Sequence, residues 1–156
     1  MLVKNKNSHR SIRVVAMDFL SRREHSAYEL TQKLKQRDFD FDEVEAAIKL
    51  LQQDNLQSDS RFIESMVNYR VNAGFGPIKI KYELQQKGIR SELVDDYLSG
   101  LGIEWEQIME SQRSKKFGQE VPLDYKEKMK QARYLQNRGF SPESVMRLFR
   151  QESSLL

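Results

Sequence analysis

The strongest constraint on the fold is an internal repeat with a period of about 50 residues. Gly139 lies 51 positions after Gly88, and Leu135 lies the same distance after Leu84. An earlier copy of the same pattern occupies residues 20–51. A repeat of this length is typical of proteins built from similar supersecondary units that stack on their neighbours. The chain is therefore expected to be an array of units rather than one spherical domain.

The middle copy, residues 72–101, shows what each unit contains. Pro77 stands where a helix begins, because the N–H that proline lacks has no partner in the first turn of a helix. Ile80 and Leu84 share one face of this helix, and Gly88 supplies the left-handed residue that ends it. A second amphipathic helix follows, and another precedes the pair in each copy. Each unit therefore has three helices.

The sequence predicts an all-α fold, an elongated array of three tandem three-helix repeats that are similar to helix-turn-helix units. The expected repeats are residues 10–53, 54–102 and 103–156, after a disordered tail at 1–9. A hydrophobic content of 38% and a charged content of 31% suit such an array of solvated helices.

Helix starts can be predicted from capping residues. Ser26 and Glu29 have the spacing of a capping box, in which each side chain binds a free backbone N–H of the first turn. Ser91 can cap the helix after Gly88. Ser141 followed by Pro142 is expected to cap and open the last helix.

The charges form alternating blocks that follow the repeat. The net-basic blocks are residues 1–35, 69–90 and 111–150, and the net-acidic blocks are 36–68 and 91–110. In a stacked array, like-charged helices could align into a basic surface suited to a polyanion or a large charged protein. The alternative is that these charges only solvate the outer helix faces.

Several basic residues have a structural alternative to binding. Lys79, Glu83 and Lys87 follow i, i+4 spacing, so part of the charge is expected to be paired within one helix. His25 is expected to be a hydrogen-bonded turn residue. Tyr69 is interpreted as a core residue, although an aromatic ring beside an arginine can also stack on a base.

The inventory of chemical groups does not indicate an enzyme. Two histidines and no cysteine give no usual metal cluster, disulfide or thiol chemistry. Gly74 and Gly76 lack the third glycine of a dinucleotide fingerprint and follow a helix, and no phosphate-binding loop motif is present. The sequence has no run of 18 apolar residues and no secretory signal, so we expect a cytoplasmic protein without a membrane span.

Three segments together resemble the RecX family, which comprises bacterial regulators of the RecA recombinase. They are LSRREHSAYELTQKL at residues 20–34, DSRF at 59–62 and GFGPIKIKYELQQKGI at 74–89. The string YLQNRGFSPESV at residues 134–145 is similar to the ending of the family. The three-helix repeats extend the resemblance over nearly the whole chain.

The resemblance implies a monomeric cytoplasmic protein that uses no cofactor and binds the RecA–DNA filament. It would lie in the helical groove of the filament and block its growth or promote its disassembly, which would lower strand exchange, ATPase and co-protease activities. Its basic faces could also contact DNA phosphates. The alternative function is general binding of single- or double-stranded nucleic acid by a helical repeat protein.

The candidate partner- and DNA-binding residues are the basic side chains expected on the surface. They are Arg22, Arg23, Arg70, Lys79, Lys81, Lys87, Lys115, Lys116, Lys126, Lys130 and Arg133. We expect reversal of the charges at Lys115, Lys116, Lys126 and Lys130 together to weaken inhibition of RecA without changing the helix content.

Overall fold

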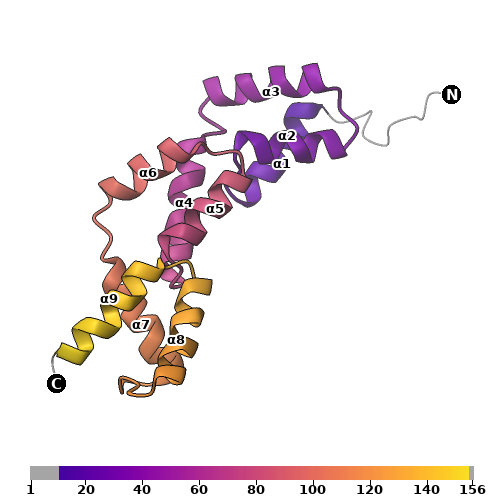
Figure 1. Ribbon diagram of the computed structural model, residues 1–156. Helices are drawn as coiled ribbons and strands as arrows, with labels where there is room; N and C mark the ends of the chain where they lie inside the picture. The colour runs from indigo at the N-terminus through magenta and orange to yellow at the C-terminus, as the bar shows by residue number, and fades with distance from the viewer. Residues whose placement is uncertain (1–10, 155–156) are drawn as a thin grey trace. The chain divides into compact units, whose positions relative to one another are not determined.

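The computed structural model describes the backbone of residues 11–154 and the side chains of 11–150. This part of the chain forms nine α-helices and no strand (Figure 1), which confirms the predicted all-α class. The helices are α1 (Ile12–Arg22), α2 (Ala27–Gln36), α3 (Phe41–Gln53), α4 (Asp59–Asn72), α5 (Pro77–Gln86), α6 (Ser91–Gly100), α7 (Trp105–Phe117), α8 (Tyr125–Asn137) and α9 (Pro142–Ser154). The tail expected at 1–9 lies outside the described residues.

The described chain divides into two compact units. The first unit comprises the residues up to Ser65 together with Gln86–Ile89, and the second comprises Met66–Gln85 and the residues from Arg90 onward. None of the helices within residues 11–154 is both long and apolar enough to cross a membrane.

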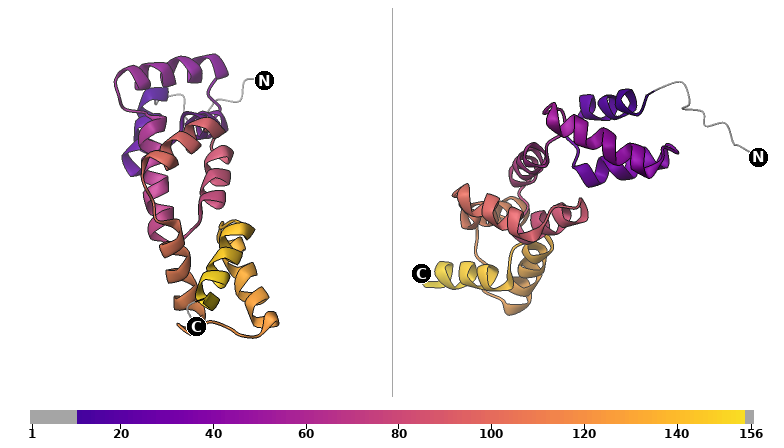
Figure 2. Two further views of the ribbon diagram at one scale, coloured as in Figure 1. Left: turned by 60° about the vertical axis from the view of Figure 1, so that its left-hand side comes forward. Right: turned by 90° about the horizontal axis from the view of Figure 1, so that it is seen from above.

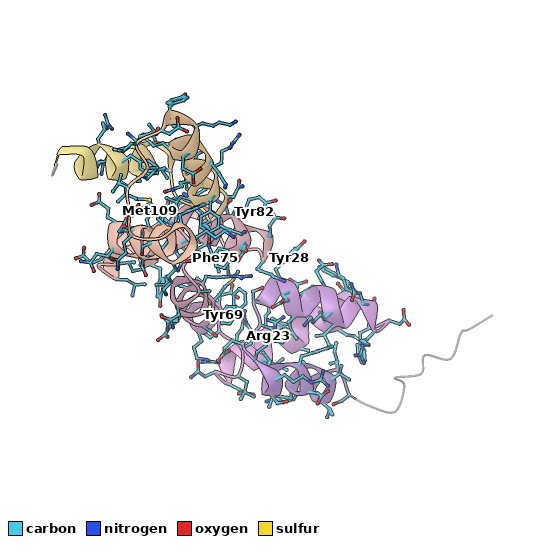
Figure 3. The ribbon with its side chains drawn as sticks, turned by 90° about the horizontal axis from the view of Figure 1, so that it is seen from below. Arg23, Tyr28, Tyr69, Phe75, Tyr82 and Met109 are labelled. Atoms are coloured by element: carbon cyan, nitrogen blue, oxygen red, sulfur yellow. The ribbon has the colours of Figure 1, made fainter. Side chains whose placement is uncertain are left out.

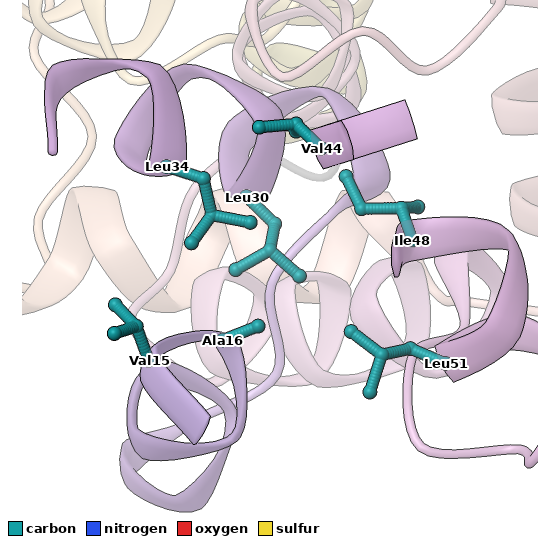
Figure 4. Close-up of a cluster of buried hydrophobic side chains, with 7 residues drawn as sticks. All are labelled: Val15, Ala16, Leu30, Leu34, Val44, Ile48 and Leu51. Carbon is teal, nitrogen blue, oxygen red and sulfur yellow. The ribbon is translucent and has the colours of Figure 1, made fainter. Parts of the chain in front are cut away.

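The core of the first unit is formed by α1, α2 and α3, which pack on one another (Figure 4). The buried residues of α2 and α3 follow i, i+3 or i+4 spacing, which places side chains on one face. On α1, the partly buried Ile12 and Phe19 extend the face formed by Val15 and Ala16. The buried residues are Val15, Ala16, Leu30, Leu34, Val44, Ile48 and Leu51. Full burial of each larger side chain stabilises the fold by roughly 1.5–3 kcal/mol before the loss of chain entropy is counted.

The second unit has an equivalent core between α7, α8 and α9, which pack on one another (Figure 2). Its buried residues are Met109, Ala132, Leu135, Phe140, Val145, Leu148 and Phe149, with Trp105 packed against them. The predicted equivalence of Leu84 and Leu135 is confirmed, since both side chains have no exposed surface.

The helix caps agree in part with the sequence. The Ser26 hydroxyl accepts from the Glu29 N–H at 3.0 Å, and the Ser141 hydroxyl accepts from the Ser144 N–H at 3.1 Å. The second half of the predicted capping box is wrong, because the Glu29 carboxylate binds cations instead of returning to the helix start. The prediction for Ser91 is also wrong, since the residue before it takes the N-cap position of α6 without a side-chain bond.

The predicted core position of Tyr69 is wrong as well, since this residue is 69% exposed. Val67 is buried on the same helix, α4. With 3.6 residues per turn, a residue two positions further along falls on the opposite side of the helix. Tyr69 therefore faces solvent.

A helix start in the first unit contacts a turn that is distant in sequence. The Ser26 hydroxyl, which caps α2, donates to the Lys87 carbonyl in the turn after α5 at 2.7 Å. Gly88 has a φ of +80°, and a Cβ atom built on it would lie 2.5 Å from the Cβ of Tyr28. We call this arrangement, between the start of α2 and residues 87–89, the first turn contact.

The second unit repeats this arrangement between the start of α5 and the turn that joins α8 to α9. The Gly76 N–H donates to the Arg138 carbonyl at 2.8 Å, and the Ile78 N–H donates to the Gly139 carbonyl at 3.0 Å. These bonds satisfy amides at the start of α5 that have no partner within the helix. We call this arrangement the second turn contact.

Candidate partner-binding site

The most exposed group of predicted binding residues lies on α7 and α8 in the second unit. Lys115 and Lys116 are in the last turn of α7, where cations interact favourably with the helix dipole. Lys126, Lys130 and Arg133 follow i, i+4, i+7 spacing and share one face of α8. We call these five residues the α7–α8 basic face.

The five residues of the α7–α8 basic face are exposed, and none of them forms an ion pair within the part of the chain that the structure describes. Their position follows from the packing of α8, which buries Gln131, Ala132 and Leu135 on its other side. The ammonium group of Lys116 lies 5.7 Å from the centre of the Tyr134 ring, so its only described contact is with a neutral group. The basic face therefore has charges that remain available to a partner.

The predicted cations of the first unit have a different environment. Arg22 pairs with Asp18 at 3.3 Å on α1. Arg23 donates to both carboxylate oxygens of Glu29, at 2.9 and 2.8 Å, and Lys87 pairs with the same carboxylate at 2.9 Å. The Glu29 side chain is only 5% exposed. Each of these three predicted cations is paired with a carboxylate of the first unit, and Arg23 and Lys87 share theirs.

The pKa of Glu29 reflects its ion pairs with Arg23 and Lys87. Burial alone would raise the pKa of the carboxyl, but hydrogen bonds and charge attraction from Arg23 and Lys87 outweigh burial and lower the pKa to about 2. The ionised carboxylate therefore belongs to the folded state and stabilises the first turn contact.

His25 lies beside this group and is buried, with 1% of its surface exposed. Its Nδ1 lies 3.1 Å from the Arg23 carbonyl and its Nε2 lies 2.8 Å from the Lys33 ammonium group. Since an ammonium group only donates, Nε2 must accept and the proton must sit on Nδ1. Burial lowers the pKa of His25, and the charges of Arg23 and Lys33 also lower it. The predicted hydrogen-bonded turn residue is confirmed.

The predicted cations on α4 and α5 are partly paired. Arg70 forms an ion pair with Glu83 at 2.7 Å, and Lys81 forms one with Asp95 at 2.8 Å. The expected pairing of Lys79, Glu83 and Lys87 within one helix is wrong, because Glu83 pairs with a residue of α4 and Lys87 with Glu29. Each carboxylate is closer to a cation from another segment than to its own helix neighbours.

Lys79 belongs to a group of cations around the Phe75 ring, which Figure 3 labels. The ring centre lies 4.8 Å from the Lys79 ammonium group and 5.1 and 4.1 Å from the guanidinium carbons of Arg70 and Arg138. Arg138 also donates to the Ala73 carbonyl and, at 3.2 Å, to the Gln112 amide oxygen. Cations gain from the negative face of an aromatic ring at such distances.

Phe75 and Arg138 were not among the candidates from sequence. Arg138 lies directly before Gly139, so its place in the repeat could have indicated a position in a turn contact. Its distance of 65 residues from Ala73 could not be read from local patterns. The structure brings Arg70, Lys79 and Arg138 together, and it brings Arg23 and Lys87 together, within their respective units.

No group of three or more potential metal ligands occurs among the residues that the structure describes. Two pockets of the described chain are open surface hollows of about 290 and 320 Å³. The first is lined by residues of α2 and α3, and the second by residues near the end of α4 and on α7.

Family models match all three predicted repeats. The first three-helix domain of RecX matches residues 13–51, the second matches 58–98 and the third matches 104–149. A protein named "Regulatory protein RecX" from Pseudomonas fluorescens (strain SBW25) is 42% identical over 138 residues, which cover 88% of this chain and 89% of the relative. The protein of the same name from Pseudomonas tolaasii is 41% identical over equal shares.

Solved structures give the same fold. The crystal structure of RecX from Lactobacillus salivarius has a TM-score of 0.76 at 23% identity and covers 93% of this chain and 96% of its own. A second structure, described as regulatory protein RecX, has a TM-score of 0.74 at 26% identity and covers 90% and 73%.

Fold and surface together define a protein made of tandem three-helix domains, with a basic face in the third domain. The three domain matches and the high identity to curated relatives then decide the family. The chain belongs to the RecX family.

Proposed function

We propose that this protein is a non-enzymatic regulator of RecA. It binds the RecA–DNA filament in the cytoplasm as a monomer, without a cofactor, and lowers recombinase, ATPase and co-protease activities. Family membership supports the regulatory role, and the observation that carries the binding site is the α7–α8 basic face. Its cations are exposed and have no carboxylate partner within residues 11–150.

The filament offers two kinds of negative charge, which are acidic side chains of its protein and phosphates of its DNA. Cations that are not yet paired gain more from such a partner than cations that must first leave an internal carboxylate. The protein would therefore contact the filament first through Lys115, Lys116, Lys126, Lys130 and Arg133. By lying in the helical groove it would block filament extension or promote disassembly.

The second candidate is general nucleic-acid binding, which the same exposed cations favour. The two functions differ in their dependence on salt and on RecA. Binding to phosphates alone should weaken by roughly one log unit per log unit of salt for each contact, with or without RecA. Binding to the filament as proposed requires RecA.

The experiment is a titration of RecA-dependent ATP hydrolysis on single-stranded DNA with this protein. Binding of the protein to the same DNA without RecA is measured in the same buffer. We expect inhibition at protein concentrations that leave most of the DNA uncovered. Inhibition that appears only when the DNA is saturated would contradict the proposal and favour competition for DNA.

A further inference from the structure

The loop between α7 and α8 displays two large apolar side chains. Leu123 is 83% exposed and Tyr125, at the start of α8, is 72% exposed. These are the highest exposures of any large hydrophobic side chain in the described part of the chain. We call residues 118–125 the α7–α8 tip.

The base of the tip is held by a fully buried arginine. Arg113 on α7 has no exposed surface and donates to the Gln119 and Glu120 carbonyls of the loop, both at 3.3 Å. It also donates to both carboxylate oxygens of Glu110 at 2.9 and 2.7 Å, and to the Gln131 amide oxygen on α8 at 3.3 Å. One guanidinium group therefore ties the loop to both neighbouring helices.

This arrangement fixes a loop that would otherwise move. Loops with few buried contacts are usually mobile, and ordering them on binding lowers affinity. Here the hydrogen bonds of Arg113 order the loop before any partner arrives, and the Glu110 carboxylate compensates the buried charge. The exposed Leu123 and Tyr125 side chains are thus presented from a preorganised base.

The charges of the tip indicate what kind of partner it fits. Glu120 and Asp124 lie in the tip, and Lys126, Glu127 and Lys128 follow directly after it on α8. Carboxylates next to the apolar side chains repel phosphates, and a leucine side chain has no favourable interaction with a phosphate. A protein surface with an apolar pocket and a rim of mixed charge avoids both problems.

We propose that Leu123 and Tyr125 are anchor residues that insert into an apolar pocket of a protein partner. This inference rests on the proposed function, so the partner is the protein component of the RecA filament rather than its DNA. Arg113 acts as a positioning residue. Rigid aromatic and aliphatic anchors in such pockets provide most of the binding energy of many interfaces.

The test uses the full chain with the double variant Leu123→Ala/Tyr125→Ala. Both residues are on the surface, so the variant should fold like wild type by circular dichroism. The matched control is Leu50→Ala/Tyr82→Ala, which removes a leucine and a tyrosine that are 54% and 60% exposed elsewhere. Binding of labelled protein is measured by fluorescence anisotropy to preformed RecA filaments on single-stranded DNA, and to the same DNA alone.

We expect the tip variant to bind filaments roughly 10- to 100-fold more weakly, since two anchors are lost, and to bind DNA alone with unchanged affinity. The control variant should bind both like wild type. Tyr125→Phe keeps the apolar ring, so its affinity for filaments should stay within about two-fold of wild type. A loss of affinity as large as that of the double variant would overturn the apolar pocket.

Other outcomes separate this inference from the proposed function. Unchanged filament binding by the tip variant would overturn the anchor role and leave the regulator proposal standing. An equal loss with DNA alone would assign the tip to nucleic acid. Concentration-dependent self-association in sedimentation, abolished by the tip variant, would assign it to a second copy of this chain. Failure of the wild-type protein to bind filaments would overturn both proposals.

Discussion

The first turn contact joins a helix start to a turn through side chains, whereas the second turn contact does so through main-chain atoms. In the first, a serine hydroxyl reaches the Lys87 carbonyl, and Arg23 and Lys87 share the Glu29 carboxylate. In the second, the amides of Gly76 and Ile78 bind carbonyls directly.

The two contacts occupy equivalent places in the repeat. Gly88 lies close to Tyr28 in the first contact, and Gly139 lies close to Lys79 in the second. Gly139 lies 51 positions after Gly88, and Lys79 lies 51 positions after Tyr28. At the first contact, Arg23 and Lys87 pair with Glu29, although composition alone would count both as available for binding. A cation's sequence position therefore says little about its availability until its partner is known.

The largest effect that separates the contacts should come from Gly139→Ala. Gly139 has a φ of +105°, and a new Cβ would lie 2.5 Å from the Cβ of Lys79 and 2.8 Å from its backbone nitrogen. We expect the free energy of unfolding to fall by about 3 kcal/mol or more, because the alanine is strained at a positive φ and its Cβ clashes with the backbone. Urea denaturation followed by circular dichroism measures this loss.

Gly102→Ala is the matched control, because Gly102 has a φ of +60° but no atom within 4 Å of its added Cβ. It should cost only about 1 kcal/mol, the strain of the backbone conformation alone. Equal losses for the two variants would show that close packing at the second turn contact contributes nothing.

Glu29→Gln should weaken the first turn contact and lower the free energy of unfolding by about 2 kcal/mol. The variant leaves Arg23 and Lys87 without an anion, but both side chains are 49% and 42% exposed, so water compensates part of the loss. Denaturation at low and high salt measures the effect, which should shrink with salt. A salt-independent loss would mean that shape rather than charge dominates at this position.

Acid should open the first turn contact before the second. The pKa of Glu29 is about 2 in the folded chain and about 4.5 in an unfolded one, so its stabilisation is complete above about 4.5 and is lost as the pH falls toward 2. The lowered pKa of His25 acts in the same direction, beginning below about 6.5. The free energy of unfolding should fall by about 2 kcal/mol, which is less than the full pKa shift implies because water screens the half-exposed partners Arg23 and Lys87.

Amide hydrogen exchange can follow this difference residue by residue. As the pH falls, the protection of the α2 amides from exchange should decrease while the protein as a whole stays folded. The amides of Gly76 and Ile78 should keep their protection. Simultaneous loss of protection at both contacts would contradict an electrostatic origin of the difference.

The smallest effect is expected for Phe75→Leu. The substitution keeps most of the apolar volume but removes the ring that lies near Arg70, Lys79 and Arg138. We expect a loss of about 1 kcal/mol, the size of partly exposed cation–π contacts. Thermal denaturation measures it, with Phe41→Leu as a control because the Lys35 ammonium group lies 4.4 Å from the centre of the Phe41 ring. A greater loss for Phe41→Leu would contradict the role of the Phe75 group.

The sequence was sufficient to predict the helices, the repeat and the serine caps of α2 and α9. Each helix and cap depends on residues within one or two turns. Tyr69 shows the limit of this reasoning, because its amphipathic context did not fix which side of α4 is buried. Glu29 shows another limit, since its partner Lys87 lies 58 residues away. The exposed lysines were predicted as a group, but only tertiary structure separates the paired cations from the unpaired ones.

We propose that unpaired cations, and not basic composition as such, bind the RecA filament. The direct test compares two variants with the same change in net charge, by the inhibition of RecA ATP hydrolysis. One reverses Lys115, Lys116, Lys126 and Lys130 to glutamate. The other reverses four basic residues that have carboxylate partners, which are Arg13, Arg22, Lys49 and Arg147.

At equal helix content, we predict that the first variant requires roughly 10- to 100-fold more protein for half-inhibition, while the second stays within a few-fold of wild type. Equal weakening of both variants would contradict the claim, because net charge alone would then explain inhibition.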